Sequence, residues 1–250
     1  MSKSKWMIAM LSLGLLSAQA LADAQRTVFT VENQFPRWEQ YEAGALVKFT
    51  DVDVPFGSVE TTEFVPYLRY GFREHIALQV ALPIVSVDPE FGSSEEGVGD
   101  VELSLQLRAY ENIFGYPYVI PHITVSLPTG DDDKGLGEGD PVVTAGISFG
   151  DKIYSHVSWV MDLGYRFNPN RDNQFLFSNS AIWHVSPELD FLFEARYQNN
   201  SGIDENTHEL LFLGGMVYDW TDQLQMGIHA GGAGTGDTNV LAQFRLSYSF

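Results

Sequence analysis

Apolar and polar residues alternate along most of this chain, and this alternation limits its fold more than any other feature. In residues 100–110, DVELSLQLRAY, apolar side chains occupy one side of an extended strand, and Glu, Ser, Gln and Arg occupy the other. A period of two with charges on the minority face predicts an all-β structure whose sheet has one apolar and one wetted face. Such segments recur, starting near Tyr41, Thr62, His75, Asp100, Tyr118, Asp140, Ile153, Gln174, Leu189, His208, Gln223 and Thr238.

The connections between these segments favour a barrel over a sandwich. Tight turns such as GFRE, GDK, VSPE and DWTD alternate with mostly longer connections such as VDPEFGSSEEGVG, PTGDDDKGLGEG and QNNSGIDENT. Short turns at one end and longer loops at the other are typical of outer-membrane barrels, and a periplasmic sandwich would not need this sorting. The sequence predicts a transmembrane, antiparallel, up-and-down β-barrel of about twelve strands over residues 41–250. The acidic loops around Glu95 and Asp132 are expected outside the cell.

The first residues have the pattern of a secretory signal. Two lysines precede an apolar run over residues 6–16, and an A-x-A pattern of small residues ends at Ala22. The apolar run is too short to span a bilayer. We therefore expect residues 1–22 to be a cleaved signal peptide and the mature chain to reach the outer membrane.

Residues 23–40 lack regular alternation, because Phe35-Pro36 interrupts it. Three interpretations remain open: a periplasmic tail, a short plug folded into the lumen, or an extra strand. Twelve strands place both ends of the barrel on the periplasmic side, whereas thirteen would break the even count usual in bacterial single-chain barrels. A tail or a plug is therefore expected.

The last segment, LAQFRLSYSF, alternates up to its final residue. An unpaired strand with an apolar face invites aggregation, so we expect the first strand to cover its edge and lipid to cover its face. A final strand that ends on Phe also resembles the C-terminal signal by which the barrel assembly machinery recognises outer-membrane barrels. Tyr248 and Phe250 are the candidate recognition residues.

Charge and cysteine content exclude several classes of protein. The chain has a formal net charge of -19 and contains no cysteine. Such acidity disfavours nucleic acid as a partner, and the lack of cysteine excludes a lipoprotein anchor and a disulfide framework. The expected partners are outer-membrane lipid, lipopolysaccharide, the barrel assembly machinery and a small-molecule substrate that the sequence does not identify. No cofactor is expected.

Two stretches have distinctive junctions between a strand and a loop. They are GVGDVELSLQLRAY, Gly97 to Tyr110, and ITVSLPTGDDDKGLGEGD, Ile123 to Asp140. The first has a G-x-G-D strand opening, and the second runs from a strand into LPTGD and a Gly-rich acidic loop. With these motifs the chain resembles the family described as putative MetA-pathway of phenol degradation, a group of exported barrel proteins. The resemblance implies an outer-membrane channel or transporter associated with hydrophobic or aromatic compounds. It implies no particular site residues.

Polar and charged side chains on the minority face are expected to line the barrel lumen. Both signs occur along the expected strands, so most of these charges should pair across the lumen rather than form an ion-selective ring of one sign. The predicted lumen-lining residues are Lys48, Arg69, Glu102, Arg108, His122, Asp162, Arg166, Glu194, Arg196 and Arg245.

Three consecutive segments carry apolar residues on this otherwise polar face. Because neighbouring strands lie about 4.8 Å apart, these side chains are expected to form one apolar patch inside the barrel. Wetting the patch costs roughly 25 cal/mol per Å², so we expect a cover. Either an inward-folded loop or residues 28–35 pack on it, or it forms a path for hydrophobic substrates. Its members are Leu176, Ile182, Leu192, Leu211, Leu213 and Val217.

A metal site has weaker support. Asp131, Asp133 and Glu138 lie in one loop that is rich in oxygen ligands. The loop lacks the bidentate Glu that closes an EF-hand, so solvated loop charge is favoured over metal binding.

The HVS motifs at residues 156–158 and 184–186 raise the alternative of an outer-membrane serine hydrolase that acts on lipid. His156 and Ser158 are expected to share a face, but neighbours on one strand rarely give the geometry of a catalytic triad, so we expect no enzyme. The predicted function is passive passage of small molecules, hydrophobic or aromatic ones included. A non-transporting structural or surface-interaction barrel is the other alternative.

Overall fold

The computed structural model describes residues 25–54, 57–109, 118–169, 173–200 and 207–250, so the expected signal peptide lies outside the described residues. Strands dominate these ranges, and no helix within them is long and apolar enough to cross a membrane. The elements are β1 (Tyr41–Val54), β2 (Gly57–Arg73), β3 (Ile76–Ala81), β4 (Ile84–Pro89), β5 (Glu95–Val98), β6 (Val101–Leu107), β7 (Tyr118–Leu127), the short 3-10 helix η1 (Asp132–Lys134), β8 (Val142–Tyr154), β9 (Val157–Phe167), β10 (Gln174–His184), β11 (Leu189–Asn200), β12 (Thr207–Asp219), β13 (Leu224–Thr235) and β14 (Thr238–Ser249).

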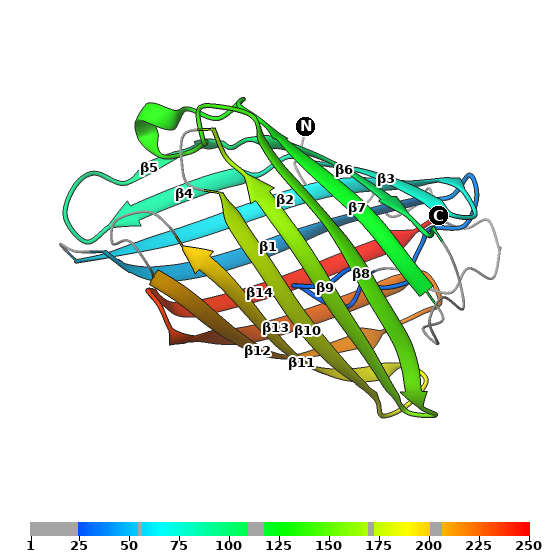
Figure 1. The fold of residues 1–250 in the computed structure, drawn as a ribbon. Helices are drawn as coiled ribbons and strands as arrows, with labels where there is room; N and C mark the ends of the chain where they lie inside the picture. The colour runs from blue at the N-terminus through cyan, green and yellow to red at the C-terminus, as the bar shows by residue number, and fades with distance from the viewer. Residues whose placement is uncertain (1–24, 55–56, 110–117, 170–172, 201–206) are drawn as a thin grey trace, which may run out of the picture.

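The strands form one antiparallel sheet that closes on itself (Figure 1). From β6 to β14 each strand pairs with the next one along the chain, and β1 pairs with both β2 and β14. At this seam the Tyr41 N–H donates to the Phe250 carbonyl at 2.9 Å, and the Phe250 N–H donates to the Tyr41 carbonyl at 2.8 Å. Their rings lie 5.8 Å apart. Closure gives both β1 and β14 a partner on each side, which removes the exposed edge of an open sheet.

Twelve strands complete the ring, and β4 and β5 extend two of them. β4 continues β3 after Leu82 and Pro83, and β5 precedes β6 across Gly99 and Asp100. The 17 residues of β2 are long enough to pair with β3 and then with β4. The prediction of an all-β, antiparallel, up-and-down barrel of about twelve strands is confirmed.

One expected loop contains two short strands instead. The sequence predicts a long acidic connection over residues 87–99, whereas β4 runs to Pro89 and β5 begins at Glu95. Proline, glycine, serine and charged residues give this stretch a weak strand pattern. Its pairing with the far part of β2 supplies the backbone hydrogen bonds, so tertiary context overrides local propensity here.

The two ends of the ring differ. Short turns at residues 74–75, 155–156, 185–188 and 220–223 lie at one end together with Tyr41 and Phe250, and we name this the short-turn end. The segments at residues 90–94 and 128–141 lie at the opposite end, the long-loop end.

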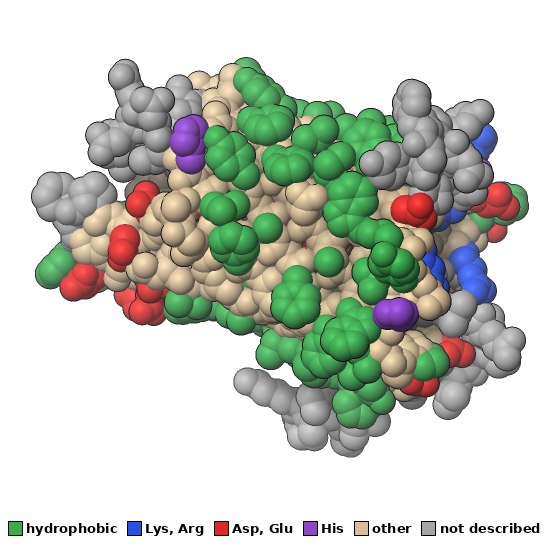
Figure 2. All heavy atoms as spheres, turned by 60° about the horizontal axis from the view of Figure 1, so that its bottom comes forward, with side chains coloured by type: hydrophobic (Ala, Val, Ile, Leu, Met, Phe, Trp, Pro, Cys, Tyr) green, Lys and Arg blue, Asp and Glu red, His purple; other side chains and the backbone are tan. Residues whose placement is uncertain are grey.

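Side chains alternate between the inside and the outside of the wall, as the sequence pattern requires. On β2, Tyr67 and Arg69 are buried inside, whereas Phe64 and Leu68 are exposed on the outside. Figure 2 shows hydrophobic side chains spread over the outer wall and acidic side chains gathered toward its two ends. An apolar band of this extent on the outside is far larger than the isolated patches of soluble monomers, and it suits a hydrocarbon environment.

The spacing between β12 and β13 predicts an unequal response of two glycines to alanine. A Cβ at Gly231 would collide with the Phe212 carbonyl oxygen, whereas a Cβ at Gly214 would meet nothing within 4 Å. Gly231→Ala should therefore lower the temperature at which the folded band disappears on unheated gels by roughly 5 °C or more. The matched control, Gly214→Ala, should leave it unchanged. Equal behaviour of the two variants would contradict this strand spacing.

Candidate functional site: the lumen and its inner segment

Residues 25–40, which we name the inner segment, lie inside the ring and form no strand (Figure 1). The segment is pinned at the short-turn end, where the Glu39 N–H donates to the Gly71 carbonyl at 2.9 Å and the Gly71 N–H donates to the Gln40 carbonyl at 3.0 Å. A Cβ at Gly71 would collide with the carbonyl oxygens of Pro36 and Arg37, so glycine permits this close approach. From this entry the chain reaches inward to β8, β10 and β11.

Two side chains of the inner segment hold its own backbone in shape. The Gln25 amide donates to the carbonyls of Glu32 at 3.0 Å and Gln34 at 2.8 Å, and its oxygen accepts the Glu32 N–H at 2.7 Å. The Glu32 carboxylate accepts the N–H groups of Arg26 at 2.6 Å and Thr27 at 3.0 Å. These bonds take the place of a strand ladder, so the segment can satisfy its backbone without joining the sheet.

Glu194 on β11 receives the tip of the inner segment. Its carboxylate accepts the Val28 N–H at 2.8 Å, the Phe29 N–H at 2.9 Å and the Ser180 hydroxyl at 2.8 Å. The Ser180 hydroxyl also lies 2.9 Å from the Thr30 hydroxyl. Glu194 is only 3% exposed, and hydrogen bonds to a buried carboxylate are among the stronger ones in proteins. The tip is therefore fixed to the wall by a charge that has several donors.

Arginines of the wall make cation–π contacts with the two phenylalanines of the inner segment. The Arg196 guanidinium lies 4.2 Å from the centre of the Phe29 ring and donates to the Phe29 carbonyl at 3.3 Å. Arg108 and Arg69 lie 4.7 Å and 5.7 Å from the centre of the Phe35 ring. Cation–π contacts that are shielded from water stabilise such pairs. Together with Glu194, four of the predicted lumen-lining residues thus contact the inner segment directly.

Apolar side chains of the inner segment and of the wall pack together in two clusters. In the first, Phe35 and Val31 pack against side chains from six strands, β3, β7 and β9 to β12. In the second, Phe29 and Val28 pack against β12, β13 and β14. The wall residues are Ala77, Tyr118, Ile120, Val160, Ile182, Leu192 and Val217 in the first cluster, and Leu211, Leu213, Ala233 and Leu241 in the second.

The predicted apolar patch is divided between these clusters. Ile182, Leu192 and Val217 belong to the first, Leu211 and Leu213 belong to the second, and Leu176 belongs to neither. Leu176 lies four residues before Ser180 on β10, toward the long-loop end.

The sequence did not predict several of the wall residues in these clusters. Ile120 and Val160 are the main ones, at 0% and 1% exposure. Val160 is the single apolar residue on the minority face of β9, and Ile120 shares the minority face of β7 only with Tyr118, so neither strand shows an apolar run on this face.

The other predicted lumen-lining residues face inward and mostly form pairs. Lys48 lies 2.7 Å from Glu63, His122 lies 2.7 Å from Asp162, and Arg166 lies 2.7 Å from Glu138. Lys48, Glu102 and Arg166 also line a cavity of about 470 Å³ at the long-loop end. Charges of both signs surround this cavity, so it forms no ring of a single sign. Arg245 is buried on β14.

The acidic loop at residues 128–141 is anchored rather than open. The buried Asp100 carboxylate accepts the N–H groups of Gly130 and Glu138, both at 2.9 Å. The Glu138 side chain turns to Arg166, while Asp131 and Asp133 remain exposed. The weak metal candidates therefore do not converge, and no group of three or more His, Asp or Glu residues in the described ranges is placed to hold a metal.

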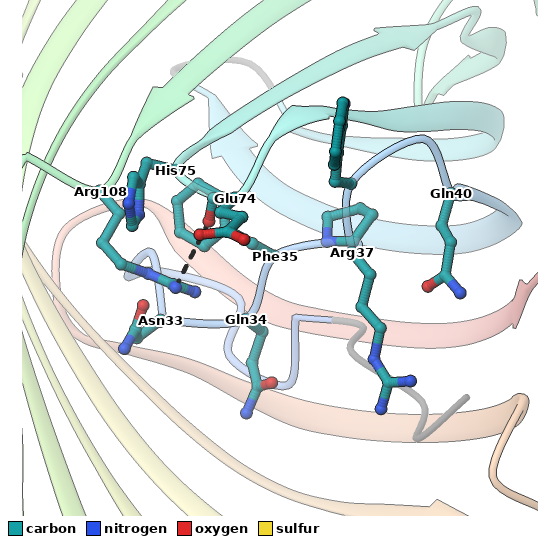
Figure 3. Close-up of a pocket in the computed structure, with 10 residues that line it drawn as sticks. Asn33, Gln34, Phe35, Arg37, Gln40, Glu74, His75 and Arg108 are labelled. Carbon is teal, nitrogen blue, oxygen red and sulfur yellow. Dashed lines mark hydrogen bonds between the residues drawn. The ribbon is translucent and has the colours of Figure 1, made fainter. Parts of the chain in front are cut away.

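A second cavity, of about 600 Å³, opens at the short-turn end beside the inner segment (Figure 3). Phe35, Arg37 and Trp38 of the inner segment line it together with His75 and Arg108 of the wall. Figure 3 shows Arg108 beside Glu74, whose carbonyl accepts its hydrogen bond at 3.4 Å. The cavity combines aromatic faces, amides and cationic groups.

A serine, a histidine and an aspartate form a hydrogen-bonded chain on the inner wall. The Ser158 hydroxyl lies 2.8 Å from His184 Nε2, and His184 Nδ1 lies 2.7 Å from the Asp190 carboxylate. The second Asp190 oxygen lies 2.9 Å from Arg26 Nε of the inner segment. The expectation that His156 shares a strand face with Ser158 is wrong, because β9 begins at Val157 and His156 occupies the preceding turn.

Comparisons with known proteins agree with this architecture. The family model described as "Putative MetA-pathway of phenol degradation" matches residues 41–250. The COG4313 outer membrane channel from Pseudomonas putida F1 has a TM-score of 0.72 at 14% identity and covers 91% of this chain and 100% of its own. The KdgM porin has a TM-score of 0.56 at 9% identity and covers 84% of this chain and 99% of its own. The CymD monoaromatic hydrocarbon channel has a TM-score of 0.52 at 10% identity and covers 85% of this chain and 89% of its own. A search of curated proteins found no match.

Replacement of Glu194 by glutamine should release the inner segment. The change removes the charge that accepts two backbone N–H groups, and hydrogen bonds to charged groups contribute about 1.5–3 kcal/mol each. We expect the displaced fraction to rise at least about tenfold, seen as higher ion conductance in planar bilayers. The matched control is Glu209→Gln, because Glu209 contacts Gln198 and Thr238 instead. Unchanged conductance of a folded Glu194→Gln barrel would contradict this anchoring role.

Proposed function

Because the chain belongs to the family described as "Putative MetA-pathway of phenol degradation", we propose that it is an outer-membrane channel for passive passage of small apolar or aromatic molecules. The twelve strands of the ring pair with a neighbour on each side, as a lipid environment demands. The apolar outer wall provides the matching surface.

The observation that carries this proposal is the pair of apolar clusters under the inner segment. A channel for polar solutes has no need of apolar side chains from six strands across its lumen. While the inner segment is docked, Phe35 and Phe29 occupy this surface. When the segment moves, the same surface offers an apolar solute a continuous contact through an otherwise polar lumen. The same apolar surface is then covered when the inner segment is docked and open to the solute when the segment is displaced.

A structurally similar protein supports this choice of solute. CymD, with a TM-score of 0.52, is described as a monoaromatic hydrocarbon channel. We extend that description to this chain because its inner surface has the matching chemistry. The cavity beside Trp38 and Arg108 would be the exit at the short-turn end.

We also propose how the protein is oriented in the cell envelope. Residues 1–22 serve as a cleaved signal peptide, and the short-turn end faces the periplasm. The long-loop end faces the exterior, where its acids meet lipopolysaccharide through shared divalent cations. Tyr248 and Phe250 serve as the recognition residues for the assembly machinery.

Uptake by whole cells tests the proposed function. Lipopolysaccharide slows the entry of apolar solutes, so cells that carry the protein should take up radiolabelled toluene faster than cells that lack it. Leu211→Asn should reduce the initial rate several-fold, because it places an amide in the second apolar cluster. The matched control is Leu176→Asn, an inner-face leucine outside both clusters. Equal rates with and without the protein, at equal levels of folded barrel, would refute the proposed function.

A lipid hydrolase is the second candidate, because Ser158, His184 and Asp190 have the order of a nucleophile, a base and an orienting acid. We propose a structural role instead, since Arg26 engages the acid and ties the three residues to the inner segment. A fluorophosphonate probe separates the two functions. We expect no labelling of the folded protein. Labelling that Ser158→Ala abolishes would establish the hydrolase.

A further inference from the structure

The cavity of about 470 Å³ at the long-loop end is separate from the inner segment, none of whose residues lines it. Its wall comes from β1, β2, β4 and β6 to β9. The loop at residues 128–141, which contains η1, completes the lining, and Figure 1 shows this loop beside β5. The cavity shares no residue with either apolar cluster. It is therefore a different site from the proposed path for apolar solutes.

Both cationic side chains that line the cavity already have an anionic partner. Lys48 Nζ lies 2.7 Å from the Glu63 carboxylate, and Arg166 Nη2 lies 2.7 Å from the Glu138 carboxylate. Glu102 on β6 also lines the cavity, and it is left without a cation of its own. The lining therefore carries an excess of negative charge.

The Glu102 carboxylate has no direct partner among the residues that the structure describes. Within these ranges no hydrogen bond and no ion pair includes it, although the side chain is half-buried. Lys48 and Arg166 attract its charge from a distance, while Glu63 and Asp100 repel it. A carboxylate that has lost part of its hydration is stabilised by donors or by a counter-charge. The cavity therefore favours a cationic occupant.

Hydroxyl groups supply further acceptors beside this carboxylate. The ladder of β6 and β7 places Ser126 opposite Glu102, and the ladder of β7 and β8 places Thr124 opposite Thr144. All three hydroxyl-bearing residues line the cavity. In the described part of the chain, no hydrogen bond includes the Ser126 or the Thr144 hydroxyl. A primary ammonium group has only N–H donors, so one carboxylate with neighbouring hydroxyl oxygens matches it.

A metal ion fits this lining less well than an organic cation. Calcium takes about six to eight oxygen ligands, and no group of three or more His, Asp or Glu residues in the described ranges is placed to hold a metal. The volume is also that of an organic ligand, since such pockets measure about 300–1,000 Å³. Part of the lining is apolar and offers contact to a carbon chain. These residues are Pro83, Val85, Leu136 and Val142.

We propose that this cavity binds a primary alkylammonium compound. The ammonium group donates to the Glu102 carboxylate and to the hydroxyls of Ser126 and Thr144, and the carbon chain lies against the apolar lining. Binding supplies the counter-charge of Glu102 and places an organic cation at the long-loop mouth of the lumen. The site needs no movement of the inner segment, so it stands or falls independently of the apolar path.

Thermal unfolding of the full-length folded protein in detergent tests the site. The gel-shift midpoint is compared in butylammonium chloride, sodium butyrate and sodium chloride at equal ionic strength. A ligand at about ten times its Kd stabilises the folded state by mass action, so butylammonium should raise the midpoint by roughly 3–6 °C over sodium chloride. Butyrate has a similar carbon chain and the opposite charge, so it should not raise the midpoint.

Glu102→Gln is the informative variant, because it keeps the shape of the side chain and removes the charge that we assign to the ammonium group. We expect it to fold, to keep its midpoint in sodium chloride and to lose the butylammonium effect. Thr144→Val should weaken the effect, because one acceptor is lost. The matched control, Glu209→Gln, changes a buried carboxylate outside the cavity and should keep the effect.

Three results would overturn the proposal. The first is an equal midpoint of the wild-type protein in butylammonium chloride and in sodium chloride. The second is a butylammonium effect that survives Glu102→Gln, because it would place the amine elsewhere. The third is a rise in calcium chloride that Glu102→Gln abolishes, because it would assign the site to a metal ion.

Discussion

The backbone pairing of β1 with β14 is the constraint on which the rest of the structure depends. The paired N–H and carbonyl groups of Tyr41 and Phe250 bring together the first and the last strand of the sequence. An open sheet of this size would expose two edges and an apolar face, both of which promote aggregation. Once the ring is closed, every strand has one outer face and one inner face. The alternation of the sequence then assigns each side chain to lipid or to the lumen.

Closure creates an interior that the wall cannot fill alone. Ile182, Leu192 and Leu211 point into the lumen and would be wetted in an empty barrel. The inner segment covers them with Phe29 and Phe35, while its exposed backbone amides go to Glu194. Apolar contact and a buried carboxylate thus act together. Their combination makes the cover specific in position, because the carboxylate fixes the place at which the phenylalanines pack.

Period-two alternation sufficed to predict the fold because it is a local property of each strand. It located twelve strands and the inward position of residues such as Arg69 and Asp162. It failed for β4 and β5, where pairing with β2 outweighs a poor strand sequence. It also failed to pair Ser158 with His184, since such contacts between strands depend on register. The shape of the inner segment depends on bonds from Gln25 and Glu32 that no periodicity reveals.

The central claim is that the inner segment lies in the lumen against β10 and β11. The chain has no cysteine, so an engineered pair gives a clean readout. The hydroxyls of Thr30 and Ser180 lie 2.9 Å apart, and the double variant Thr30→Cys and Ser180→Cys should form a disulfide in the folded barrel in membranes. Thr30→Cys with Ser104→Cys should not, because Ser104 on β6 contacts Thr124. A folded barrel in which the first pair stays reduced under mild oxidation would contradict the account.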